Sequence, residues 1–203
     1  MGATAPAADA ACGGAQHFSP TKLRQPGAPP LAVGDSVMLG AASRLQAAGF
    51  ELDVRGCRQM SEGIGVLAAR RRAGSLPNVV VVALGTNWTV TTSQVRTALR
   101  VLGPNRVLGL VTPPEVGGVA SSDQAVMRAA GRRWRLRVKV LDWVAHSAGR
   151  AWTWDGMHLT PGGAAAYARL LSRAFDWPLP RLEMTLQRAT AAEPPDRLSS
   201  WSA

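Results

Sequence analysis

The run VVVVAL at residues 79–84 constrains the fold of this chain more than any other feature of its sequence. Four consecutive valines favour a β-strand, and the lack of alternating polar residues indicates a strand that is buried on both faces. Such strands are typical of the centre of a parallel sheet that is covered by helices on each side. A chain of 203 residues is long enough to bury a core of this kind within one domain.

Strand-like and helix-like segments alternate around this run. Five alternations predict a three-layer α/β/α fold, in which a parallel sheet of about five strands has helices on both faces. Gly49 is expected to end the first helix, and Thr92 or Ser93 is expected to cap the third. The predicted strands cover residues 31–33, 51–55, 79–84, 106–111 and 138–141, and the predicted helices cover 37–48, 60–73, 91–102, 122–135 and, after Pro161, 164–175.

The two ends of the chain differ in composition from this middle part. Residues 1–30 are rich in Ala, Gly and Pro, and we expect them to form a flexible arm without a core of its own. Residues 31–178 are predicted to be the folded domain. Residues 179–203 are predicted to be a polar, loosely attached tail with one short helix near 182–188.

Polar and glycine residues follow several of the predicted strands. Gly34-Asp35-Ser36 follows the first strand, Gly56 the second and Gly85-Thr86-Asn87 the third, and Asp155-Gly156-Met157-His158 precedes the last helix. Because ligands of such sheets bind at the carboxyl ends of the strands, these segments are expected to meet in one site. Each motif alone is weak, whereas the four in this order are specific.

In this order the motifs resemble the first, second, third and fifth blocks of the SGNH hydrolases, also called the GDSL esterase/lipase superfamily. The resemblance covers about residues 31–175 and implies an SGNH-hydrolase or flavodoxin-like fold. The chain is most similar to SGNH domains that are fused to, or associated with, bacterial membrane acyltransferases that O-acetylate cell-wall glycans. The sequences GDSVM at 34–38, GCRQ at 56–59 and DW at 142–143 carry that closer resemblance.

These residues suit acyl transfer through a serine ester. Ser36 is the expected nucleophile, His158 the base that removes its proton, and Asp155 the carboxylate that orients the imidazole. The backbone N–H groups of Ser36 and Gly56 and the side-chain amide of Asn87 are the expected oxyanion donors. The neighbouring Asp35 is expected to be a structural carboxylate that binds loop N–H groups.

Substrate contacts are harder to predict. Arg58 and Gln59 are expected to position either the substrate or the loop that carries Gly56, although a solvated polar loop is an equal alternative. Trp88, Trp152 or Trp154 is hypothesised to form an acyl- or sugar-contacting wall at the mouth of the site. The alternative for each tryptophan is ordinary core packing, since tryptophan buries a large apolar area.

The leading functional prediction is a serine esterase that hydrolyses small, acetyl-like esters through an acyl-serine intermediate. One alternative is an O-acetyltransferase that transfers the acyl group to a cell-wall or surface glycan. Another is a non-catalytic glycan-binding module, which would not need Ser36, Asp155 and His158 together. The expected partners are a small ester or an O-acylated glycan and, by resemblance, a membrane acyltransferase. The sequence does not indicate an oligomeric state.

The charge and the cysteines leave alternatives open. A formal net charge of +10, almost all from arginine, reflects either the base composition of the gene or attraction to an anionic partner. No nucleic-acid-binding motif accompanies the arginines, so nucleic-acid binding is not expected. Cys12 and Cys57 are either unrelated thiols or a disulfide that requires an oxidising compartment.

Neither a metal nor another cofactor is expected, since three scattered histidines and two cysteines give no metal-ligand spacing. The first residues of the chain lack a signal-peptide pattern. The resemblance nevertheless implies a location outside the cytoplasm, so the compartment stays open.

Overall fold

A six-stranded sheet lies at the centre of the computed structural model, which describes residues 12–114 and 122–180. The strand order is β1-β3-β2-β4-β5-β6. Strands β2 to β6 pair in parallel, as predicted, and β1 pairs antiparallel with β3 at one edge. The strands are β1 (Gln16–Phe18), β2 (Leu31–Gly34), β3 (Glu51–Val54), β4 (Val79–Ala83), β5 (Val107–Val111) and β6 (Val138–Leu141).

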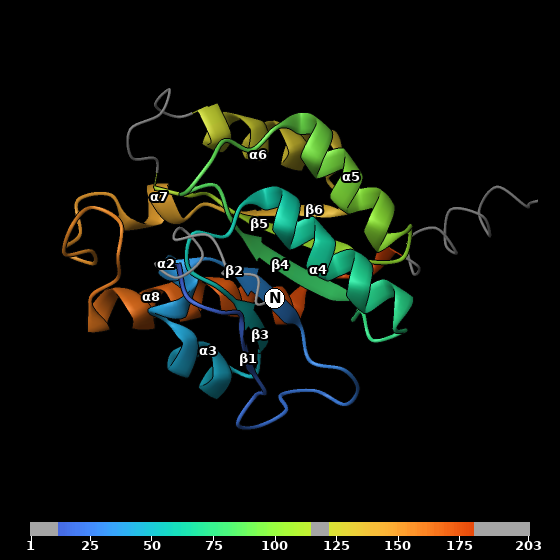
Figure 1. Cartoon of the computed structure of the whole chain (residues 1–203), viewed down its shortest axis with the longest axis horizontal. Coiled ribbons are helices and arrows are strands. Elements are labelled where there is room, and N and C mark those ends of the chain that lie inside the picture. The colour runs from blue at the N-terminus through green and yellow to red at the C-terminus, as the bar shows by residue number, and fades with distance from the viewer. Residues whose placement is uncertain (1–11, 115–121, 181–203) are drawn as a thin grey trace, which may run out of the picture.

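Helices cover both faces of this sheet, which confirms the predicted three layers (Figure 1). Helices α4, α5 and α6 lie on one face, and α3 and α8 lie on the other. None of the described helices has both the length and the apolarity that crossing a bilayer requires. The helices are α2 (Ser36–Leu39), α3 (Ala42–Ala48), α4 (Met60–Arg72), α5 (Thr92–Leu102), α6 (Ser122–Arg133), α7 (Trp143–Ser147), α8 (Pro161–Leu171) and the 3₁₀ helix η1 (Ser172–Asp176).

Strand β4 explains why its sequence lacks alternation. Val80 and Val82 pack into the core beneath α4, α5 and α6, whereas Val81 and Ala83 pack into the core on the α8 side. Successive side chains of a strand point to opposite faces, and here both faces are covered. Residues at even positions face one apolar layer and residues at odd positions face the other. All of them must therefore be apolar, as the unbroken valine run is.

Most helix boundaries follow from local chemistry. Gly49 ends α3 in a left-handed conformation (φ 102°), as predicted. Thr91, one residue before the expected caps, is the N-cap of α5, and its hydroxyl accepts the N–H of Gln94 at 3.2 Å. The single helix predicted over 37–48 is instead two helices, α2 and α3, that separate at Gly40, because glycine weakens a helix interior.

The prediction of a flexible arm over residues 1–30 needs correction in its described part. Residues 16–18 form the edge strand β1, which pairs with β3, and Phe18 packs against the core. A three-residue strand between Gly- and Pro-rich segments has too weak a pattern to recognise, because its stability comes from the neighbouring strand. The domain boundary expected at residue 31 therefore leaves out one strand of the sheet.

At the other end, η1 and Trp177 continue the packing of α8 onto the core. The packed part of the domain therefore continues to Trp177, one residue before the boundary expected at residue 178. Residues 181–203 of the expected tail, with the short helix predicted near 182–188, lie outside the described residues.

Part of the arginine excess has a structural use at the carboxyl end of α5. Arg137 donates to the carbonyl of Leu99 at 2.9 Å, and Arg106 donates to the carbonyl of Leu102 at 3.0 Å. Arg71 donates to the carbonyl of Arg100 at 3.2 Å. Cations at a helix C-terminus satisfy its free carbonyls and its dipole, so these three arginines need no external anionic partner.

Candidate active site

The four motifs meet at the carboxyl edge of the sheet. Gly34, at the end of β2, pairs with Val54 of β3 on one side and with Ala83 of β4 on the other. The segments that carry Ser36, Gly56 and Asn87 therefore leave the sheet next to one another. The register predicts this proximity, because the carboxyl ends of adjacent parallel strands lie at the same edge.

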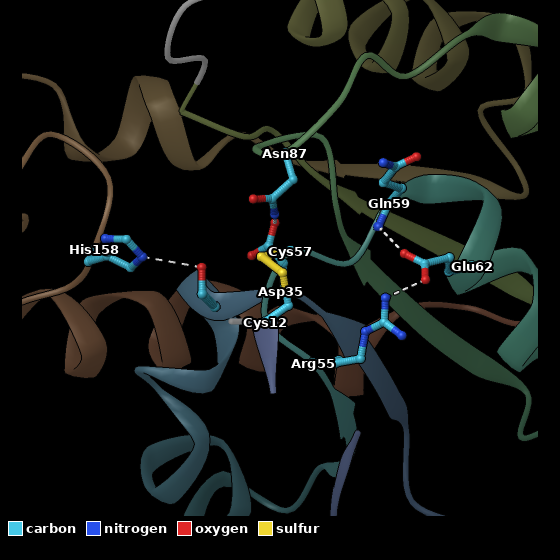
Figure 2. Close-up of a disulfide and its surroundings, with 9 residues drawn as sticks. Cys12, Asp35, Arg55, Cys57, Gln59, Glu62, Asn87 and His158 are labelled. Carbon is cyan, nitrogen blue, oxygen red and sulfur yellow. Dashed lines mark hydrogen bonds and ion pairs between the residues drawn. A yellow bond between two sulfur atoms is a disulfide. The ribbon is translucent and has the colours of Figure 1, made fainter. Parts of the chain in front are cut away.

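Ser36 and His158 are joined across 122 positions of sequence. The Ser36 hydroxyl oxygen lies 3.2 Å from Nε2 of His158, and both side chains are partly buried (Figure 2). Ser36 is the first residue of α2, directly after β2, so the strand-to-helix turn presents its hydroxyl at the sheet edge. A base within hydrogen-bond reach is the geometric requirement for activating a serine hydroxyl.

Asp155 completes a continuous hydrogen-bonded series. Its Oδ2 lies 2.6 Å from Nδ1 of His158, and its Oδ1 accepts the N–H groups of Met157 and His158 at 2.9 and 2.6 Å. The turn depends on Gly156, whose φ of 84° is rarely adopted by residues with a side chain. The hydrogen bond with His158 lowers the pKa of Asp155 to about 2, so this carboxylate is ionised at neutral pH.

Asp35 and Asn87 form a second polar pair beside Ser36. Asp35 is 1% exposed, its Oδ1 accepts the N–H of Val37 at 3.0 Å, and its Oδ2 accepts from Nδ2 of Asn87 at 3.2 Å. Burial raises the pKa of Asp35 to about 6, against the opposing effects of hydrogen bonds with the Val37 backbone and the Thr86 side chain. The expected structural role of Asp35 therefore includes orienting Asn87. An amide NH₂ has two N–H donors, so Asn87 keeps one for another acceptor.

Gly56 lies between the sheet and the N-terminal segment. A Cβ at Gly56 would lie 2.5 Å from the carbonyl oxygen of Cys12, so the backbones approach closely only because this residue is glycine. Cys12 and Cys57 form a disulfide, which decides between the two alternatives left open by the sequence (Figure 2). The sequence did not predict that Cys12 lies close to Gly56. The only feature of the sequence that could have indicated this contact is the presence of two cysteines.

Arg58 does not contact the open side of the site. It is 3% exposed, and its guanidinium donates to the carboxylate of Asp53 at 2.7 Å and to the Asp53 carbonyl at 2.5 Å. A buried cation needs a close anion, and Asp53, itself 4% exposed, supplies it. These bonds to β3 favour the predicted role of holding the loop, while a substrate contact of Arg58 stays a prediction.

Gln59 lies at the start of α4. Its backbone N–H donates to Oε2 of Glu62 at 2.8 Å, and Glu62 also pairs with Arg55 (Figure 2). These contacts cap the helix and hold the loop between β3 and α4. A substrate contact of the exposed Gln59 side chain stays a prediction.

The tryptophans divide into two groups. Trp154 is 71% exposed and stacks on the His158 ring with centroids 5.4 Å apart, and Trp88, directly after Asn87, is 66% exposed. Trp152 instead stacks on the buried Trp143 with centroids 5.7 Å apart. The core-packing alternative therefore holds for Trp152, while Trp88 and Trp154 are large apolar surfaces beside the site.

Within residues 12–114 and 122–180, no group of three or more His, Cys, Asp or Glu side chains could hold a metal ion. The arrangement of Ser36, His158 and Asp155 can nevertheless transfer a proton from the serine hydroxyl to the imidazole. The carboxylate favours the tautomer with the proton on Nδ1, which leaves Nε2 free to accept the serine proton.

Comparisons with known proteins agree with this geometry. Over 150 residues, or 72% of its length, the chain is 30% identical to the peptidoglycan O-acetyltransferase OatA of Listeria monocytogenes serovar 1/2a, of which the match covers 24%. It is 29% identical over 150 residues to YrhL of Bacillus subtilis (strain 168), which is provisionally named as a peptidoglycan O-acetyltransferase and of which 23% is covered. The chain thus spans about a quarter of the length of these curated relatives.

The fold has a solved counterpart in the C-terminal catalytic domain of Streptococcus pneumoniae peptidoglycan O-acetyltransferase A, determined with a methylsulfonyl adduct. The TM-score is 0.58 at 24% identity, and the match covers 75% of this chain and 97% of that domain. No family model matches the chain.

The predicted relationship and the predicted fold are both confirmed by these matches. The relatives are acyltransferases by name, which agrees with the expectation of an enzyme that acts on carboxylic esters. The chain is similar in sequence to the peptidoglycan O-acetyltransferases over 150 residues and has the fold of the SGNH-like catalytic domain of one of them.

Proposed function

We propose that this domain transfers a small acyl group, acetyl by preference, from an ester donor to a hydroxyl of a peptidoglycan-type glycan. Hydrolysis is then the side reaction in which water replaces the sugar hydroxyl. The observation that supports the proposal most directly is the hydrogen-bonded series from Ser36 through His158 to Asp155. Both the esterase and the transferase use this series in the same first half-reaction, and the names of the relatives favour transfer.

The reaction runs in two halves on the proposed residues. The Ser36 oxygen attacks the carbonyl carbon of the donor while His158 Nε2 takes the hydroxyl proton, and the resulting oxyanion binds the N–H groups of Ser36, Gly56 and Asn87. The leaving alcohol takes the proton from His158, and acyl-Ser36 remains. The glycan hydroxyl then gives its proton to His158 and attacks the acyl carbon. His158 returns this proton to the departing Ser36 oxygen, which releases the O-acyl glycan and free Ser36.

The exposure of the site favours a polymeric acceptor. The side chains of His158 and Asp155 are 34% and 30% exposed, and Trp154 and Trp88 are more exposed than either. An extended glycan can reach such a surface without entering a closed pocket. Flat aromatic faces offer apolar contact to sugar rings, so the two tryptophans are the proposed acceptor contacts.

The disulfide supports a location of this domain outside the cytoplasm. Cys12 and Cys57 are bonded, and such bonds persist mainly in oxidising compartments. A cell-wall glycan substrate would be met in the same compartment. The inferred location therefore follows from two independent features, the bond and the relatives' names.

A transfer assay tests the proposed function. We expect wild-type protein with p-nitrophenyl acetate as donor and a chitooligosaccharide as acceptor to yield an acetylated oligosaccharide, detected by mass spectrometry. The matched acceptor is the same oligosaccharide with all hydroxyls methylated, which should yield free acetate only. Acetate without acetylated glycan would favour the esterase. Glycan binding without ester turnover would favour the glycan-binding module.

Truncation of Trp154 to alanine is expected to raise the KM for the oligosaccharide acceptor about 2- to 10-fold, because an aromatic contact is worth ~0.5–1.5 kcal/mol. The melting temperature should change little, since this side chain is 71% exposed. Trp152→Ala is the matched control and should lower the melting temperature through the lost stack on Trp143. An unchanged acceptor KM in Trp154→Ala would contradict a sugar contact.

A further inference from the structure

The loop of residues 55–59 between β3 and α4 carries Gly56, which the proposed function makes an oxyanion donor. A donor stabilises the transition state only if its N–H points to the position that the oxyanion will occupy. The contacts that hold this loop therefore bear directly on the rate. The inference below rests on the proposed function.

On its inner side, the loop is held by the core of the domain. The N–H of Arg55 donates to the carbonyl of Gly34 at 3.2 Å, which continues the β2–β3 pairing by one bond. The buried guanidinium of Arg58 binds Asp53 of β3 at 2.7 Å. These two ties hold both flanks of the pair Gly56 and Cys57.

On its outer side, the loop is held by the N-terminal segment. The Cys12 carbonyl occupies the space that a side chain on Gly56 would take, and the Cys12 sulfur is bonded to Cys57. Cys57 has φ 55°, a left-handed conformation that residues with a side chain rarely adopt. A non-glycine residue persists in such a conformation where its surroundings hold it, and the bond to Cys12 is one of the contacts that surround Cys57.

We propose that the Cys12–Cys57 disulfide is a positioning element of the site, which holds the Gly56 N–H towards the oxyanion, and that its reduction lowers turnover while the domain stays folded. The closeness of Cys12 to Gly56 separates this role from general stabilisation, because the bond is formed beside the loop that carries the donor. Cys57 is exposed, so a thiolate can attack the bond from solvent. With dithiothreitol, the disulfide takes up two electrons and two protons to give two thiols, and the dithiol closes to its cyclic disulfide.

The first test is the double variant Cys12→Ser/Cys57→Ser, assayed with p-nitrophenyl acetate. We expect kcat to fall about 10- to 100-fold, which is less than the ~10²- to 10³-fold typical for the complete loss of one oxyanion donor. The KM should stay within about 2-fold, since a donor aimed at the oxyanion binds the ground state weakly. Titration of Ser36 with a fluorophosphonate gives the concentration of active sites, so kcat is expressed per competent site.

The matched control is Phe18→Ala. Phe18 lies on the same N-terminal segment and packs against the core, so its loss loosens β1 while the disulfide remains. We expect a lower melting temperature and an unchanged kcat per active site. The same kcat loss in this variant would overturn the proposal, because the effect would then belong to the segment as a whole.

If the double variant does not fold, chemical reduction of the wild-type protein tests the same proposal without any substitution. Activity should fall as free thiols appear under dithiothreitol and return on reoxidation, while near-UV circular dichroism stays native. Full activity in the fully reduced, folded protein would overturn the proposal. Wild-type and Ser36→Ala proteins are assayed in parallel. Full activity of Ser36→Ala would show that the proposed function itself fails, which is a different outcome from failure of the disulfide proposal.

Discussion

Replacement of Ser36 by alanine is expected to lower the turnover of p-nitrophenyl acetate by roughly 10³- to 10⁶-fold, the range typical for loss of an attacking serine. Without the hydroxyl no acyl-enzyme can form. The remaining turnover is direct attack by water, assisted only by substrate binding and by the oxyanion donors. The fold should tolerate the change. The hydroxyl gives one bond, to His158 at 3.2 Å, so the free energy of unfolding should change by about 1 kcal/mol or less.

The measurement pairs steady-state kinetics with mass spectrometry after exposure to a fluorophosphonate. Wild-type protein should gain one adduct on Ser36, and Ser36→Ala should gain none. The matched control is Ser43→Ala, which removes an exposed hydroxyl from α3 and should keep both rate and adduct. Equal rates for wild type and Ser36→Ala would end the serine mechanism, whatever the fold.

Replacement of Asp155 by asparagine should lower kcat by roughly 10²- to 10⁴-fold with the fold intact. The asparagine oxygen can still accept the N–H groups of Met157 and His158, but an NH₂ group would replace Oδ2 beside His158 Nδ1. A donor at that position favours the tautomer with its proton on Nε2, which then cannot accept the proton of Ser36.

The pH dependence of the wild type follows from the same contact. Because the hydrogen bond with His158 lowers the pKa of Asp155 to about 2, the carboxylate stays ionised above about pH 4. Its favourable contribution is present above the pKa of the unfolded chain and is lost as the pH falls towards 2. Asp155 should therefore add no ionisation step to the pH–activity profile between pH 7 and 4, whereas Asp35, whose pKa burial raises to about 6, ionises within that range.

A matched control for this prediction is Asp176→Asn, an exposed carboxylate of η1 that follows the far end of α8 from His158. Its kcat should equal that of the wild type at every pH. A wild-type rate in Asp155→Asn would remove Asp155 from the mechanism and leave Ser36 and His158 as a dyad.

Local patterns were sufficient for the layers and for the position of the motifs. The valine run of β4 had to be buried on both faces, because both the even and the odd positions were apolar. Once the strands were parallel, the segments after Gly34, Val54 and Ala83 had to emerge at one edge, and Ser36, Gly56 and Asn87 came with them. These properties depend on neighbouring residues and on the chirality of the chain.

The sequence alone predicted the parallel sheet, its covering helices and the candidate residues Ser36, Asp155 and His158. The tertiary structure decided which side chains face solvent and which segments touch: Arg58 turned inward to Asp53, Trp152 joined the core while Trp154 stayed exposed, and Cys12 reached Gly56. The reason is physical. The periodicity of a segment indicates which of its residues are buried against a neighbouring layer. Ion pairs, ring stacks and disulfides instead join specific residues that come together only when the chain has folded.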